Sequence, residues 1–169
     1  MKKISLLIVI TLVVGLVSCG GEKKKEDEKE AVQIGAKEVS KKADENSVTL
    51  ALSGNDLMQF DKTELKAKAG QKVTLNLRHT GKMDLKVMGH NFVLLKQGTE
   101  IPAFSLEAAT AGESNDWIPD GDAVIAHTKM LGGGQATSIT FTAPSAGTYD
   151  FICSFPGHSG LMKGKFIVE

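Results

Sequence analysis

The sequence predicts an all-β domain, an antiparallel sandwich interrupted by one short helix. Apolar and polar residues alternate with period two at 48–52, 73–77 and 139–141, as expected of half-buried strands. Glycine-containing turn signals separate such runs at short intervals. Many short strands between turns are typical of a β-sandwich, so we expect the folded domain to cover residues 47–169.

The predicted strands share this alternation or a short apolar run bounded by turns. They cover residues 47–53, 57–60, 63–68, 71–79, 83–88, 91–95, 123–127, 136–142, 147–153 and 164–168. Residues 102–112 break the pattern and predict a short helix inserted between two strands, with Trp117 close behind it. We find no internal repeat.

The first residues predict an exported protein. Two lysines precede an apolar run at 4–18, which is shorter than the roughly 20 residues that a membrane-spanning helix needs. Residues 1–18 are therefore interpreted as a signal peptide. Its end at 16–19 resembles the bacterial lipobox, which implies that Cys19 is lipidated and becomes the N-terminus. The alternative is ordinary cleavage near Ser18, which leaves a free thiol.

A charged tether is predicted between the anchor and the domain. All residues from 22 to 30 are charged, with mixed signs, and such a run buries too little apolar surface to fold. We interpret residues 19–46 as a disordered tether that holds the domain at a bacterial membrane, facing the periplasm or the cell surface. The charge run also resembles the surface-export signals of some lipoproteins, although a plain solvated spacer explains it as well.

Charge and cysteine content exclude several classes of protein. Twenty basic residues balance twenty acidic ones, so the chain lacks the basic excess of a nucleic-acid-binding module. Only two cysteines are present, Cys19 and Cys153, and they lie far apart in different contexts. This excludes a disulfide-rich scaffold and a four-cysteine zinc site.

The chemistry concentrates in one loop near the C-terminus. Cys153, His158 and Met162 follow one another with the spacing C-x4-H-x3-M between two predicted strands. Thiolate, imidazole and thioether together favour copper over hard cations. Each residue alone is more often structural than ligating. A second histidine must come from elsewhere, and Gly89-His90 is the natural source, because glycine permits close backbone approach.

Several stretches resemble azurin, a member of the cupredoxin family. They are Gly89-His90-Asn91, residues 125–129, the loop C-x-F-P-G-H-S-x-L-M-K-G at 153–164 and an N-terminal match at 54–60. Plastocyanin-like cupredoxins space the loop C-x2-H-x4-M, so four residues between cysteine and histidine favour azurin. The resemblance covers essentially all of the domain and implies a cupredoxin-like Greek-key sandwich.

The resemblance also implies a cofactor, one type 1 copper ion. Cys153, His90 and His158 would hold it in a trigonal plane, with Met162 and the carbonyl of Gly89 as distant axial groups. A metal that only changes its charge by one unit needs no new ligands. Packed strands would hold the ligands in place and so limit their rearrangement during that change.

Groups around the ligands follow from the same resemblance. Asn91 and the backbone amide of Phe155 would orient the ligands by hydrogen bonds. An apolar surface patch would serve as the port for electron exchange. It comprises Met58, Val87, Met88, Phe155 and His158.

Other positions carry less information or depart from azurin. His79 matches an azurin histidine that modulates redox behaviour, but a hydrogen-bonded structural role is the more common one. We expect His127 to be structural. The disulfide usual in azurins is missing, because its positions correspond to Val48 and Gly70, and Phe92 replaces the buried tryptophan.

The sequence therefore predicts a membrane-tethered electron carrier and not an enzyme. Its partners would be redox proteins such as c-type cytochromes or a terminal reductase, with no nucleic acid, and we expect a monomeric domain. A copper-binding or delivery protein without an electron-carrier role is the alternative, although the tether lacks the methionines and histidines that it predicts. A multicopper oxidase would flank Cys153 with histidines, and a dinuclear site would need a second cysteine in the loop.

Overall fold

The computed structural model describes residues 45–169. The predicted signal peptide, Cys19 and nearly all of the predicted tether lie outside the described residues. Nine strands are found in the described part: β1 (Ser47–Asn55), β2 (Gln59–Phe60), β3 (Glu64–Ala67), β4 (Lys72–His79), β5 (Val93–Leu95), β6 (Val124–His127), β7 (Ala136–Thr142), β8 (Gly147–Ile152) and β9 (Lys163–Val168). Two α-helices, α1 (Leu85–Met88) and α2 (Ile101–Ala111), and two 3-10 helices, η1 (Glu113–Asn115) and η2 (His158–Gly160), complete it.

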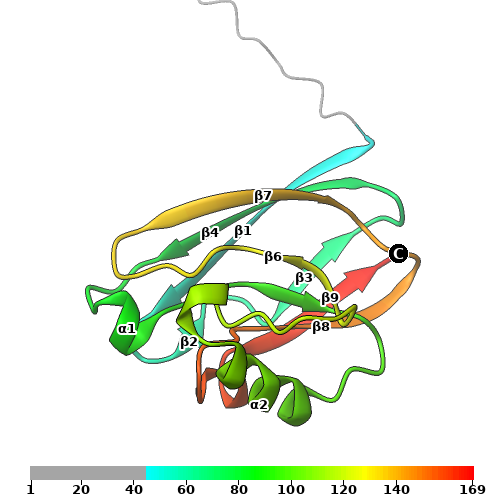
Figure 1. Ribbon diagram of the computed structural model, residues 1–169. Helices are drawn as coiled ribbons and strands as arrows, with labels where there is room; N and C mark the ends of the chain where they lie inside the picture. Colours follow the sequence, from blue (N-terminus) through cyan, green and yellow to red (C-terminus); the bar gives the residue numbers. More distant parts are fainter. Residues whose placement is uncertain (1–44) are drawn as a thin grey trace, which may run out of the picture. The chain divides into compact units, whose positions relative to one another are not determined.

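The strands form two sheets that face each other, which confirms the predicted all-β sandwich (Figure 1). One sheet has the order β2-β1-β4-β7 and the other the order β3-β9-β8-β5-β6. The sheets are mixed, however, and not purely antiparallel, because β1 pairs with β4 and β3 with β9 in parallel. The chain leaves the first sheet after β2, forms β3 in the second and returns as β4, which is the kind of crossover that parallel neighbours require.

The main core lies between the sheets, where the inward-facing residues of alternating strands meet. Val73, Leu75 and Leu77 on β4 are fully buried, together with the rings of Phe92 and Phe151. The rings of Phe92 and Phe151 are tilted against each other by 34°, with centroids 5.5 Å apart. Phe92 is thus part of an aromatic cluster in the core.

A second core cluster lies on the other face of the five-stranded sheet, beneath α2. Phe104 and Ala108 of the helix pack there with Trp117 and with Val93 and Ile152 of the sheet. Figure 1 shows α2 along the outer side of the strands β8 and β9. The predicted inserted helix is confirmed one residue earlier than expected, and it ends where Gly112 adopts a positive φ of 74°.

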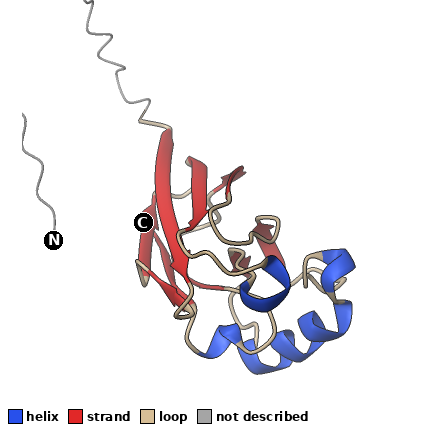
Figure 2. Cartoon of the chain, turned by 90° about the vertical axis from the view of Figure 1, so that its left-hand side faces the viewer, coloured by secondary structure: helices blue, strands red, loops and turns tan. Residues whose placement is uncertain are grey.

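The predicted strand at 83–88 is wrong. The segment forms α1, whose N-cap is Asp84: its carboxylate accepts a hydrogen bond from the backbone N–H of Lys86 at 2.9 Å. The first N–H groups of a helix have no acceptor within the helix, and the Asp84 carboxylate supplies one. This favours a helical turn over a strand that would have no neighbouring strand to pair with. The helical segments gather at one end of the domain (Figure 2), and α1 delivers the chain directly to Gly89. No helix of residues 45–169 is long and apolar enough to cross a bilayer.

Candidate metal centre

Three side chains from separate segments meet in the interior. Cys153 directly follows β8, His158 begins η2, and His90 forms an isolated bridge with Leu131 between α1 and β5. Their ligand atoms all lie within 4.8 Å of one another. The thiol sulfur of Cys153 is 4.0 Å from Nδ1 of His90 and 3.7 Å from Nδ1 of His158. All three residues are buried.

These distances fit one metal ion bound between the three atoms. A metal–nitrogen bond of about 2.0 Å and a metal–sulfur bond of about 2.3 Å, opened to a trigonal angle of about 120°, separate nitrogen and sulfur by about 3.7 Å. Two imidazoles and one thiolate form the trigonal set of blue-copper electron-transfer sites. Among the described residues no other histidine, cysteine and carboxylate group has this proximity.

A hydrogen bond fixes which nitrogen of His90 faces the centre. Its Nε2 lies 2.8 Å from the backbone oxygen of Asn55. Because a carbonyl oxygen only accepts, Nε2 carries the proton and the neutral ring presents the lone pair of Nδ1 toward Cys153. The last residue of β1 therefore orients a candidate ligand that lies 35 residues further along the chain.

Burial keeps the three groups uncharged without metal. It raises the pKa of the Cys153 thiol from 9.0 to about 12, against the opposing effect of the backbone N–H groups of Asn91 and Phe155. Burial, with a smaller contribution from the charge of His90, lowers the pKa of His158 from 6.5 to about 4. Burial likewise lowers the pKa of His90. Neutral imidazoles are ready to ligate, and a bound cation displaces the thiol proton.

Gly89 and Met162 lie close to these three residues. The backbone oxygen of Gly89 is 3.7 Å from the sulfur of Cys153. A Cβ on Gly89 would lie 2.7 Å from the backbone oxygen of Leu85 and 2.8 Å from the ring of Phe155, so glycine is required by close packing. Met162 is fully buried, and its backbone oxygen accepts a hydrogen bond from the N–H of Cys153 at 2.9 Å.

The methyl end of Met162 and the ring of His90 both lie close to Gly54. A Cβ built on Gly54 would lie 3.1 Å from Cε of Met162 and 2.8 Å from Cδ2 of His90, so both side chains crowd the same glycine. Both side chains therefore lie beside the backbone of Gly54. A carbonyl oxygen and a thioether are weaker ligands than imidazole and thiolate.

Asn91 joins the two segments that carry the ligands. Its side-chain oxygen accepts from the backbone N–H of Ser154 at 2.8 Å, and its Nδ2 donates to Oγ of Ser154 at 2.8 Å and to the backbone oxygen of Asp116 at 3.2 Å. The ring of Phe155 lies against His158, with centroids 4.6 Å apart. The predicted group of Phe155 is its backbone N–H, which acts on the Cys153 thiol by lowering its pKa against the effect of burial, as the backbone N–H of Asn91 does.

The remaining histidines have different surroundings. His79 is fully buried and stacks on His90, with ring centroids 4.2 Å apart and planes 18° from parallel. Its Nδ1 accepts from the N–H of Gly81, so Nε2 donates to the backbone oxygen of Met88 at 2.7 Å. His127 is exposed on β6 and is not part of the His90, Cys153 and His158 group.

The predicted surface patch is only partly exposed. Val87 is 62% exposed, Met58, Met88 and Phe155 are half-buried, and His158 is 3% exposed. Leu57 and Leu161 lie outside the predicted patch, yet they are 70% and 64% exposed and are next to Met58 and Met162 in the sequence. The sequence feature that points to both leucines is a large apolar residue next to a residue of the predicted patch or ligand set.

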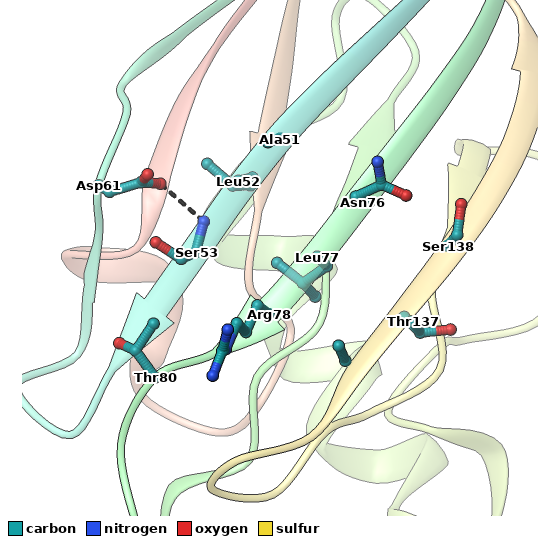
Figure 3. A pocket seen from close by; sticks show the side chains of 11 residues that line it. Ala51, Leu52, Ser53, Asp61, Asn76, Leu77, Arg78, Thr80, Thr137 and Ser138 are labelled. Atoms are coloured by element: carbon teal, nitrogen blue, oxygen red, sulfur yellow. Dashed lines mark hydrogen bonds between the residues drawn. The ribbon is translucent and has the colours of Figure 1, made fainter. Parts of the chain in front are cut away.

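The outer face of the four-stranded sheet carries a hollow that is unrelated to this centre. It has a volume of about 600 Å³ and a floor of short side chains, with Ser53, Asn76, Arg78 and Ser138 around it (Figure 3). The backbone N–H of Ser53 donates to the carboxylate of Asp61 at its edge, at 2.6 Å. No residue that lines it is a candidate metal ligand.

Comparisons with known proteins agree with this geometry. Residues 46–169 match the family model of copper binding proteins of the plastocyanin/azurin family. An azurin of Bordetella pertussis is 47% identical over 118 residues, which cover 67% of this chain and 78% of that protein. Azurin-1 of Alcaligenes xylosoxydans xylosoxydans is 48% identical over 118 residues, covering 67% and 91%.

A solved structure supports the same assignment. Auracyanin A, described as a "blue" copper protein from Chloroflexus aurantiacus, is 36% identical, with a TM-score of 0.67 over 73% of this chain and 99% of that one. The family match and the donor set of His90, Cys153 and His158 identify the cofactor as a single copper ion of type 1. The chain belongs to the plastocyanin/azurin family of copper-binding proteins.

Proposed function

We propose that this protein is a blue-copper electron carrier that cycles between Cu(I) and Cu(II) and passes single electrons between redox partners. The buried group of His90, Cys153 and His158 carries the proposal. Met162 and the carbonyl oxygen of Gly89 would be the weak axial groups. The ligands are held by β8, by η2 and by the hydrogen bond from His90 to Asn55. We therefore expect the ligands to move little when the charge of the metal changes by one unit.

The test is the colour of the copper-loaded protein. We expect an intense visible thiolate-to-copper absorption band in the protein loaded with Cu(II) and no such band in Cys153→Ser, because serine supplies no thiolate. His158→Gln should lose or shift the band, whereas His127→Gln, the matched change of an exposed histidine, should leave it unaltered. A colourless wild-type protein would overturn the proposal.

Electron exchange separates a carrier from a copper-delivery protein. Val87 is exposed and Met88 is half-buried directly before Gly89. We expect fast electron exchange with a c-type cytochrome, slowed by Met88→Gln because an apolar contact near the centre becomes polar. Copper transfer to an acceptor protein without electron exchange would favour delivery instead.

We further propose that the protein is exported and anchored to a membrane through lipid on Cys19. The support is the apolar run that ends in Leu16-Val17-Ser18-Cys19. In bacterial cells Cys19→Ser should move the full-length protein from the membrane to the soluble fraction. Recovery of both forms in the soluble fraction would contradict the anchor and leave the copper proposal intact.

A further inference from the structure

The ligand loop is held at its two ends, and in its middle the N–H of His158 donates to the backbone oxygen of Phe155 at 3.0 Å. Its beginning is tied to Asn91 through Ser154, and its end is tied through Met162, whose backbone pairs with that of Cys153. Between them, Gly157 has a φ of 83°, which favours glycine, and a Cβ on Gly160 would meet nothing within 4 Å. His158 lies between these two glycines, and contacts from outside the loop give this stretch further support.

The inserted segment 101–117 supplies that support at two points. Oγ of Ser105 on α2 lies 2.8 Å from Oγ of Ser159, the residue that follows His158. The ring of Trp117 lies 4.9 Å from the ring of Phe155, which in turn contacts His158. One contact is polar and the other aromatic, and they hold the loop on either side of the imidazole.

The inserted segment is itself firmly held. Phe104 and Ala108 anchor α2 in the second core cluster with Trp117, all of them buried. The carboxylate of Asp116 accepts a hydrogen bond from the N–H of Met130 at 3.2 Å, which fixes the turn before Trp117. A helix that is fixed by packing also restricts the conformation of a loop that it contacts.

The hydroxyl of Ser105 has a defined place in this arrangement. It lies 2.8 Å both from the backbone oxygen of Ile101, one helical turn earlier, and from the hydroxyl of Ser159. Ser105 is the donor in both hydrogen bonds, so its one proton is shared between the Ile101 carbonyl oxygen and the Ser159 hydroxyl oxygen. The loop hydroxyl is thereby connected to the backbone of α2.

We propose that Ser105 is a positioning residue: through Ser159, it fixes the place of the His158 imidazole before copper binds. The inference concerns the metal-free loop, and it deepens the proposed function by adding that α2 sets the geometry of one copper ligand. The hydrogen bond with Ser159 is expected to slow opening of the turn that begins at His158. The backbone N–H groups of Leu161 and Met162, which donate to the oxygen of His158, report on that turn.

The first test uses amide hydrogen exchange in the copper-free full chain, residue by residue. Ser105→Ala should speed exchange at Leu161 and Met162 by about fivefold, the effect of losing one ordinary hydrogen bond. Thr110→Ala is the matched control, because Thr110 also donates to the backbone oxygen four residues earlier, that of Leu106, and makes no hydrogen bond with the loop. Ser105→Thr keeps the hydroxyl and should restore slow exchange.

Two more variants, Ser159→Ala and the double variant, test the same hydrogen bond, so the conclusion does not depend on the folding of Ser105→Ala alone. Ser159→Ala removes the same hydrogen bond from the loop side and should reproduce the faster exchange, and Ser105→Ala added to it should produce no further increase. Equal exchange in Ser105→Ala and Thr110→Ala would overturn the proposal. So would additive effects of the two serine substitutions.

The copper-loaded protein gives a separate readout. Ser105→Ala should shift the reduction potential and the electron paramagnetic resonance spectrum relative to Thr110→Ala, and Ser105→Thr should return both toward the wild type. Unchanged potential and spectrum would contradict the role in ligand geometry. A wild type that stays colourless with Cu(II) would overturn the proposed function alone, because the exchange experiment needs no copper.

Discussion

Burial sets the protonation state of each candidate copper ligand in the metal-free protein. Cys153 stays a thiol because its pKa is raised to about 12, and His158 stays neutral at pH 7 because its pKa is lowered to about 4. Three uncharged groups cost less to bury than a thiolate beside two imidazolium ions. Copper changes this balance, since the cation stabilises the thiolate that the protein alone disfavours.

These shifts predict how the stability of the copper-free protein depends on pH. Below about pH 6.5 an unfolded chain takes up protons on His90 and His158. In the folded chain the pKa of both is lowered, that of His158 to about 4, so His158 stays neutral until about pH 4. The free energy of unfolding should therefore fall as the pH drops through this window. Above about pH 9 the unfolded thiol ionises before the folded one, and stability should fall again. Urea unfolding between pH 4.5 and 10 measures both limbs.

Variants of the two residues assign these limbs. His158→Gln should flatten the acid limb, since the unfolded state then gains one proton fewer, and Cys153→Ser should remove the limb above pH 9. His127→Gln, at an exposed position, is the control for the acid limb. Constant stability of the copper-free protein from pH 7 to 4.5 would contradict the assignment.

Gly89 provides a test of close packing at the centre. Its φ of −66° suits any residue, so the restriction is steric and comes from Leu85 and Phe155. Gly89→Ala should destabilise the protein by about 1–3 kcal/mol, as overpacking does, and displace the neighbouring His90. Gly160→Ala is the matched control, because a Cβ there meets nothing within 4 Å. Urea unfolding and the visible copper band measure the two effects, and equal behaviour of both variants would refute the steric account.

At the scale of elements, the ligand loop was the part that the sequence predicted best. Cys153, His158 and Met162 fall within ten residues between two strands, so their meeting depends on one local turn. His90 lies more than sixty residues before Cys153. In the sequence it was distinguished only by its place between predicted strands and by the glycine before it. The contacts of Ser105 and Trp117 depend on how α2 packs on the sheet, and no local pattern encodes that.

The error at 83–88 also has a local physical reason. Met83, Leu85 and Val87 alternate with polar residues as a strand would, yet two of the three are exposed, so the alternation marks no buried face. The cap at Asp84 decides the conformation instead, through its bond to Lys86. Alternation predicts a strand only where one of its faces is covered.

The cap predicts an effect on stability. Asp84→Ala should lower the free energy of unfolding by about 1 kcal/mol, because the N–H of Lys86 loses its acceptor at the start of α1. Asp120→Ala, an exposed acidic residue in a loop, is the control. Urea unfolding of the copper-free protein measures the change, and an Asp84→Ala protein as stable as the control would show that α1 needs no cap.

At the scale of the molecule, packing and metal binding must hold the sandwich together without a disulfide. Cys153 is the one cysteine among residues 45–169, and it is buried and free. The aromatic cluster of Phe92, Phe151 and Phe166 fills the space between the sheets. Copper adds a further link, since its candidate ligands come from the segment before β5 and from the loop between β8 and β9.

Copper removal should therefore lower the stability of the whole domain. A metal that binds only the folded state adds RT ln(1 + [L]/Kd) to the free energy of unfolding, about 4 kcal/mol at a thousandfold excess over Kd. Thermal unfolding of the copper-loaded and copper-free proteins at pH 7 should show a higher Tm with copper. In Cys153→Ser most of that difference should vanish, while the copper-free midpoints stay within a few degrees of each other. A Tm of the wild type that is independent of copper would mean that packing alone replaces the missing disulfide.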